Sequence, residues 1–180
     1  MDRLKKTALL TALAENLRKK GCWCGETHLQ KATYFLQALE KVPVGFDFIL
    51  YKHGPFSFEL RDELTAMRAD GLFDLNQQWP YGPTLIPTPK SKLLRQQCSK
   101  TLQKYKRQLN FVSDQLGKQN VSELEKLATA LYIRIEASSK TETQRAKYLH
   151  SLKPHVSLDD SLEAVKTVDG IVKLAKSASA

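Results

Sequence analysis

The amino-acid sequence predicts a mainly α protein with a small β-sheet, built as a winged-helix-like core followed by a helical C-terminal half. Apolar residues recur at helical spacing along most of the 180 residues. A run of aromatic and β-branched residues at 46–51 is typical of a strand. Two short apolar runs, 72–75 and 84–86, follow a helix as the strands of a hairpin would, and a helix followed by such a hairpin suggests a wing.

The first part, residues 1–88, is expected to hold the winged-helix-like core. Its predicted elements are two helices, a strand, a helix and a hairpin, at 2–20, 28–41, 46–51, 58–69, 72–75 and 84–86. Thr27 and Gln30 have the spacing of a capping box at the second helix. Ser57 is placed to cap the third helix, and the linker 76–83 is long enough to form the tip of a wing.

The second part, residues 89–180, is predicted to be helical and to pack on the first as one unit. Thr88-Pro89 opens a long helix that we expect to run to about 116. Its apolar positions, here called the seam, follow spacings of four and three: Leu94, Cys98, Leu102, Tyr105, Leu109, Val112 and Leu116. The seam either packs inside the monomer or pairs across a homodimer. Three more helices are expected behind the caps Ser122, Thr141 and Ser157.

Net charge and cysteine content narrow the class of protein. The chain carries a formal charge of +9, and residues 90–118 hold eight Lys or Arg against one Asp. Nucleic acid, an acidic protein surface and a solvated helix face all remain open as explanations. The sequence contains no apolar run long enough to span a membrane. Its three cysteines are too few for a disulfide framework, which favours the reducing cytoplasm.

A basic face is expected on the long helix, on the side away from the seam. Such a stripe of basic residues usually marks a helix face in contact with solvent. The alternatives are that it binds an acidic protein or a nucleic-acid backbone. The residues of this basic face are Lys92, Lys100, Lys104 and Arg107.

The segment between the strand and the third helix is the first candidate for a functional surface. It leads into a helix N-terminus, where free N–H groups attract anionic or carbonyl groups. The alternative is that Gly54-Pro55 only turns the chain and Ser57 only caps the helix. With the aromatic residues of the wing, the predicted partner-binding residues are Tyr51, Lys52, His53, Gly54, Pro55, Phe56, Ser57, Arg61, Trp79 and Tyr81.

Catalytic and metal-binding patterns do not stand out. The sequence has no G-x-S-x-G, no H-E-x-x-H and no phosphate-binding loop, so we expect no enzyme and no cofactor. Cys22 and Cys24 near His28 have C-x-C spacing and no second cysteine pair, which argues against a metal site. The helix 58–69 carries more acidic than basic side chains, which makes it a poor reader of DNA.

Three stretches carry a family resemblance. They are LQKATYFLQ at 29–37, YKHGPFSFEL at 51–60 followed by Gly71-Leu72, and LKPHVS at 152–157. In this order they resemble the Panacea (SocA-like, YwgA-like) family of bacterial proteins. The chain departs from that pattern at Ala32-Thr33, where the family carries bulkier aliphatic residues, and at Phe73 in place of Ile.

The resemblance implies a binding function without catalysis. Panacea domains are often antitoxins that neutralise toxins by direct contact, and one relative is an adaptor that hands its toxin to a protease. The resemblance therefore implies a protein-binding module whose partner is a toxin encoded nearby, and it brings no catalytic residues. The alternative, favoured by the charge and the wing, is a winged-helix transcriptional regulator that binds nucleic acid.

Overall fold

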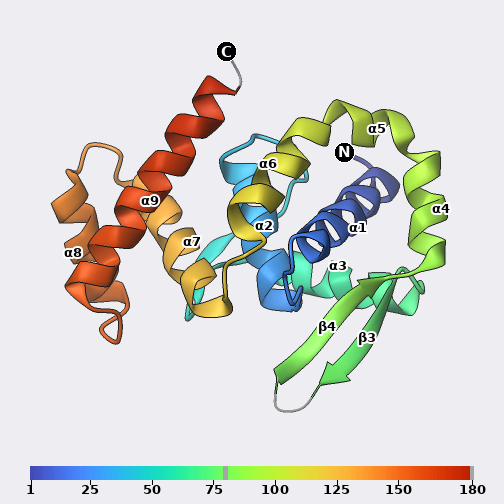
Figure 1. The fold of residues 1–180 in the computed structure, drawn as a ribbon, viewed down its shortest axis with the longest axis horizontal. Coiled ribbons are helices and arrows are strands. Elements are labelled where there is room, and N and C mark those ends of the chain that lie inside the picture. The colour runs from blue at the N-terminus through green and yellow to red at the C-terminus, as the bar shows by residue number, and fades with distance from the viewer. Residues whose placement is uncertain (79–80, 179–180) are drawn as a thin grey trace. The chain divides into compact units, whose positions relative to one another are not determined.

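The computed structural model describes residues 1–78 and 81–178, and this part of the chain is mainly helical (Figure 1). It contains two antiparallel two-stranded sheets. The prediction of a mainly α fold with a small amount of β-structure is confirmed, and the winged-helix-like interpretation stays a prediction. Within these residues, no helix has both the length and the apolarity needed to cross a membrane.

The chain folds into two compact units. Unit 1 comprises Met1–Phe48 and Ser57–Gln119, and unit 2 comprises Ile49–Phe56 and Asn120–Ala180. The boundary that the sequence predicts at residue 88 falls inside unit 1, because the segment after it packs back onto the first helix. The helices and strands of unit 1 are α1 (Arg3–Lys19), α2 (Glu26–Ala38), α3 (Phe58–Ala69), β3 (Phe73–Gln78), β4 (Tyr81–Pro87), α4 (Pro89–Gln97), α5 (Ser99–Lys104) and α6 (Lys106–Leu116).

Helix α1 forms the centre of unit 1. Asp2 caps it by accepting a hydrogen bond from the Lys5 N–H at 3.0 Å. Helices α2, α4, α5 and α6 and strand β4 all contact α1, and Figure 1 shows α4, α5 and α6 as an arc around it. The core of the unit therefore lies where α1 meets these elements, and Leu9, Leu10 and Leu13 of α1 are fully buried there.

The single long helix predicted for 89–116 is wrong. Cys98 and Tyr105 have ψ angles of 22° and 15°, which end one helix and begin the next. A straight helix over this span would extend about 40 Å, far beyond an α1 of about 25 Å at 1.5 Å per residue. The two bends let all three short helices contact α1, and the seam residues Leu94, Leu109 and Leu116 become buried within the monomer.

The helix–hairpin region of unit 1 follows the prediction, with different ends. Helix α2 begins at Glu26 behind Gly25, so the predicted cap at Thr27 is wrong. Ser57 does cap α3, accepting from the Leu60 N–H at 3.2 Å. Strands β3 and β4 pair antiparallel from Phe73↔Pro87 to Gln78↔Tyr81 and form the predicted hairpin with longer strands than expected.

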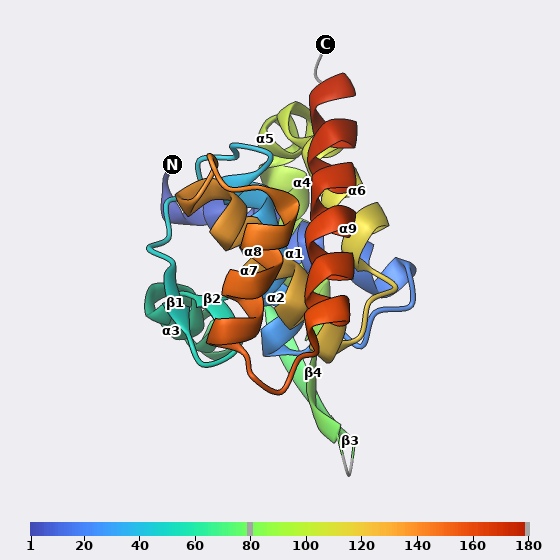
Figure 2. The same ribbon diagram turned by 90° about the vertical axis from the view of Figure 1, so that its left-hand side faces the viewer.

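Unit 2 joins a small hairpin to three helices. Its elements are β1 (Ile49–Tyr51), β2 (Gly54–Phe56), α7 (Val121–Glu136), α8 (Glu142–Leu152) and α9 (Leu158–Ser177). The three helices contact one another and β2 packs on α7, as Figure 2 shows. Thr141 and Ser157 cap their helices as predicted, whereas Asn120, and not Ser122, caps α7.

Strand β2 corrects the prediction around the Gly-Pro turn. The sequence predicts one strand over 46–51 followed by a turn over 52–55. The structure shortens that strand to β1 and pairs Tyr51 with Gly54 and Ile49 with Phe56. The turn is therefore a two-residue loop of Lys52 and His53. Gly54, with φ of 89°, lies in the left-handed region that favours glycine, and it starts the return strand.

Candidate functional site

The hairpin corner, residues 51–56, gathers six of the predicted partner-binding residues in unit 2. Lys52 and His53 are exposed at its tip, whereas Gly54 and Pro55 are buried. A Cβ atom on Gly54 would lie 2.6 Å from Oγ1 of Thr129 and 3.3 Å from the Glu125 carbonyl oxygen. The corner therefore rests directly on the backbone of α7, and only glycine allows this approach.

An apolar face lies on the exposed side of the same hairpin. Ile49 and Tyr51 alternate along β1, so their side chains share one face, and they are 49% and 47% exposed. Half-buried Phe56 is the cross-strand partner of Ile49, and its ring centroid lies 5.9 Å from that of Tyr51. Ile49, Tyr51 and Phe56 are called the hairpin face below.

A buried charge pair lies behind the corner. Nδ1 of His53 is 3.2 Å from Oε2 of Glu125, and Nζ of Lys153 is 3.8 Å from the same oxygen. The Lys153 side chain is only 4% exposed, and its Nζ has no hydrogen-bond partner in the described part of the chain. Burial lowers the pKa of Lys153, and the nearby Glu125 carboxylate opposes that shift.

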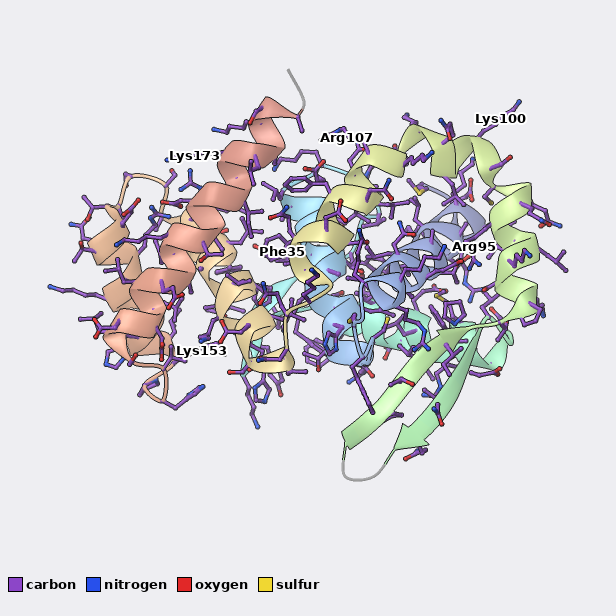
Figure 3. All side chains as sticks on the ribbon, in the orientation of Figure 1. Phe35, Arg95, Lys100, Arg107, Lys153 and Lys173 are labelled. Carbon is purple, nitrogen blue, oxygen red and sulfur yellow. The ribbon has the colours of Figure 1, made fainter. Side chains whose placement is uncertain are left out.

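These contacts explain how the hairpin corner is held. Figure 3 shows Lys153 at the end of α8, and Glu125 comes from α7, so a carboxylate of α7 holds the tip residue His53 while Lys153 approaches it from the other side. Sequence reasoning missed Glu125, Thr129 and Lys153 as site residues. Lys153 belongs to the third family-like stretch, which was the available signal. Glu125 has capping-box spacing to Ser122, a pattern that predicts a helix start and not a contact with His53, and Thr129 carries no local pattern.

The other predicted partner-binding residues are distributed differently. Ser57 is fully buried and its backbone is bonded to Gln30, so it is a structural cap, as the alternative interpretation held. Arg61 of α3 is exposed, lies over the Phe58 ring at 5.1 Å and pairs with Asp62 at 2.9 Å.

The wing residues among the predictions are described only in part. Trp79 lies outside the described residues, so its predicted role has no structural test. Tyr81 is placed only through its backbone, which pairs with Gln78 at the end of β4.

The predicted basic face does not lie on a single helix. Lys92 is on α4, Lys100 and Lys104 are on α5, and all three are exposed. Figure 3 shows Lys100 pointing away from the arc. Arg107 of α6 has a structural role, because its Nη2 donates to Oε2 of Glu40 at 2.9 Å and the Glu40 side chain is 1% exposed.

A basic cleft lies instead on the inner side of the arc. One shallow hollow of about 580 Å³ lies between α1 and the helices α4 to α6, and a second of about 610 Å³ lies between α1, the end of β4 and α4. Arg18, Lys19, Lys92 and Arg95 line the second hollow, and Glu15 pairs with both Lys19 and Arg95. These four residues are called the basic cleft below. Only Lys92 belongs to the predicted basic face, because the cleft exists only once α4 bends back along α1.

The hairpin corner presents apolar and polar side chains together on its surface. The hairpin face offers apolar surface, and Lys52 and His53 add polar groups beside it. Among the described residues, no group of three or more His, Cys, Asp or Glu side chains is arranged to hold a metal ion. No protein-family model matches this chain, and no curated protein matches it either.

Proposed function

We propose that this protein is a non-catalytic protein-binding module that works as an antitoxin or adaptor, as the resemblance to Panacea proteins implies. The observation that carries the proposal is the hairpin face. It combines large apolar side chains, roughly half exposed, with a backbone that Gly54 fixes against α7. Exposed apolar groups on a rigid support are the usual anchors of protein interfaces, because little conformational entropy is lost on binding.

The family-like stretches support this proposal through their contacts. Gln30 of the first stretch bonds Ser57 of the second, within unit 1. His53 of the second stretch and Lys153 of the third approach the same Glu125 carboxylate, within unit 2. Residues of the family-like stretches therefore take part in the contacts that hold each unit together, and in unit 2 those contacts lie behind the hairpin corner.

The partner expected at the hairpin face is a protein with an apolar segment flanked by acidic residues. Lys52 and His53 lie at the tip beside the apolar side chains, and the whole chain carries a charge of +9. Complementary charge would speed association, while the apolar contact would supply most of the affinity. We place this interaction in the cytoplasm, where the free cysteines Cys22, Cys24 and Cys98 stay reduced.

Co-expression with the product of the neighbouring gene tests the proposal. The expected result is that the chain restores growth to cells that express that product and elutes with it as a complex. Ile49→Ser with Tyr51→Ala should abolish both effects. Leu174→Ser, an equally exposed apolar residue on α9, should leave both unchanged. Failure of the unmodified chain to rescue growth or to form a complex would remove the antitoxin role.

The second candidate function is nucleic-acid binding, and the basic cleft favours it. Arg18, Lys19, Lys92 and Arg95 bring positive charge together, and helix α3 is followed by the hairpin β3–β4, the combination from which the sequence predicts a winged helix. Against it, helix α3 presents Glu59 and Asp62 among its exposed residues. Phosphate contacts through the cleft would give binding that weakens steeply as salt is raised.

Fluorescence anisotropy with a random-sequence duplex separates the two functions. If the cleft binds nucleic acid, Lys19→Glu with Lys92→Glu should abolish binding at low salt. Lys173→Glu, an exposed lysine outside the cleft, should reduce binding little. No binding by the unmodified chain at low salt would end the nucleic-acid hypothesis and leave the protein-binding one intact.

A further inference from the structure

The segment between α1 and α2 holds a cysteine in an unusual backbone conformation. Cys24 is fully buried and has φ of 56°, in the left-handed region that costs a residue with a side chain about 1–2 kcal/mol. Its carbonyl oxygen accepts the Leu85 N–H at 2.9 Å, which holds the segment against β4. Backbone strain of this kind persists only where the surrounding structure imposes it, and it often marks a functional position.

The strained backbone directs polar hydrogens at a second sulfur. The Cys24 N–H donates to Sγ of Cys22 at 3.1 Å. The Cys24 thiol itself donates to the Ala14 carbonyl oxygen at 3.7 Å. Its interaction with Cys22 is the main reason that the pKa of Cys22 is lowered. His28 acts in the same direction, and burial opposes the shift. The pKa of Cys24 is raised, chiefly by its interaction with Cys22 and then by burial.

His28 completes the cluster. It lies in the first turn of α2 and is buried, and its Nδ1 has no hydrogen-bond partner in the part of the chain that the structure describes. Its imidazole acts on Cys22, the thiol whose pKa it helps to lower. One short segment thus holds a thiol with a lowered pKa, a second cysteine whose N–H is bonded to its sulfur, and a buried imidazole with an unpartnered nitrogen.

The geometry points to a peroxide-sensitive thiol pair, in which Cys22 is the attacking thiolate and Cys24 is the resolving thiol. Hydrogen peroxide is the oxidant. The Cys22 sulfur attacks one peroxide oxygen, an S–O bond forms, the O–O bond breaks, and the departing hydroxide takes a proton from the solvent to become water. The Cys24 sulfur then attacks the Cys22 sulfur, the S–S bond forms, and the hydroxyl leaves as a second water with the proton of Cys24.

Cys98 provides an internal control in the same chain. It is more exposed than Cys22, and its Sγ donates to the Leu4 carbonyl oxygen at 3.8 Å. Its pKa is raised, first by burial and then by the charge of Asp2. If access alone decided oxidation, Cys98 would react first. If thiolate character decides it, as the pair requires, Cys22 reacts first.

Peroxide titration of the reduced, unmodified chain tests the inference. The expected product loses two hydrogen atoms in mass, peptide mapping places a disulfide between Cys22 and Cys24, and dithiothreitol reverses it. In Cys24→Ser, a sulfenic-acid probe such as dimedone should label Cys22 about tenfold faster than Cys98. His28→Gln should slow the reaction of the unmodified pair.

The result that would overturn the inference is oxidation of Cys98 ahead of Cys22, or peroxide treatment that yields no Cys22–Cys24 disulfide in the unmodified chain. Because the peroxide titration uses the unmodified chain, neither of these results can be caused by a variant that fails to fold. Cys98→Ser serves as the second measurement, since it should keep the same oxidation of the pair. Loss of the reaction in Cys98→Ser would show that Cys98, and not Cys24, is the resolving thiol.

Discussion

The side-chain amide of Gln30 bonds both backbone groups of Ser57. Nε2 donates to the Ser57 carbonyl oxygen at 2.9 Å, and Oε1 accepts the Ser57 N–H at 3.0 Å. Both residues are buried, so no solvent replaces either bond. Helix α2 therefore fixes the point where the chain enters α3, and the hydroxyl of Ser57 is left free to cap that helix.

Substitution of Gln30 should measure the strength of this link. Gln30→Leu leaves a buried N–H and a buried C=O unsatisfied, and we expect a loss of about 2–4 kcal/mol in the free energy of unfolding. Gln37 makes the same pair of bonds to Phe46 and is only half-buried, so Gln37→Leu should cost about 1 kcal/mol. Urea unfolding of both variants makes the comparison. Equal losses of stability in the two variants would show that burial does not determine the free-energy cost of removing these hydrogen bonds.

Gly54→Ala should destabilise the hairpin corner. The new methyl group would meet Oγ1 of Thr129 at 2.6 Å, and alanine disfavours a φ of 89°. Together these effects should cost about 2–4 kcal/mol in thermal or urea unfolding. Adding Thr129→Ala should restore part of the stability, because it removes the nearest atom while the φ penalty remains. Gly82→Ala, where no atom lies within 4 Å, is the matched control and should cost little.

The stability of unit 2 should fall in acid through Asp169. Arg145 donates to both carboxylate oxygens at 2.7 Å, and Arg134 also pairs with it. These bonds, that of Arg145 above all, lower the pKa of Asp169. A carboxyl with a lowered pKa in the folded state stabilises the protein above its unfolded pKa of about 3.9, and that contribution is lost as pH falls through the folded value.

Asp169→Asn should therefore destabilise the protein at neutral pH and flatten its acid unfolding curve. It leaves the buried guanidinium of Arg145 without a counter-charge, at a cost of about 3–5 kcal/mol. Asp62→Asn, which removes the partner of exposed Arg61, should cost less than about 1 kcal/mol. A variant that unfolds with the same pH dependence as the original chain would contradict this prediction.

At pH 7, Lys153→Met should either leave the free energy of unfolding unchanged or raise it by about 1 kcal/mol or more. Burial lowers the pKa of Lys153, so the folded state binds fewer protons than the unfolded chain between the folded pKa and about 10.4. Stability of the unmodified protein should therefore rise with pH across that interval, and Lys153→Met should abolish the rise.

Denaturant midpoints measured from neutral to alkaline pH test the Lys153 prediction. Lys173→Met, an exposed lysine on α9, is the matched control and should keep the pH dependence of the unmodified chain. A large destabilisation by Lys153→Met at pH 7 would mean that the ammonium group makes a stronger interaction with Glu125 than the 3.8 Å separation indicates.

The elements of the fold were largely predictable, because they depend on local spacing and caps. The periodicity of 2–20 predicts α1, and Ser57, Thr141 and Ser157 cap the helices that they were expected to cap. The local pattern failed where neighbouring elements decide. Cys98 and Tyr105 read as ordinary helical positions, yet the chain bends there so that α4 to α6 follow the surface of α1.

The candidate site was predictable only in its exposed tip. The Gly-Pro signal located residues 51–57, and the structure keeps Lys52 and His53 exposed there. That signal could not identify Glu125 as the partner of His53, because the two residues lie 72 positions apart in the chain.

What the sequence by itself determined is the local conformation: helical stripes, capping residues and a glycine where the chain turns back. What the tertiary structure decided is which distant groups meet, such as Gln30 with Ser57 and Lys153 with Glu125. The physical reason is that backbone preferences act over a few residues, whereas burial and charge pairing depend on contacts between segments that only the folded chain brings together.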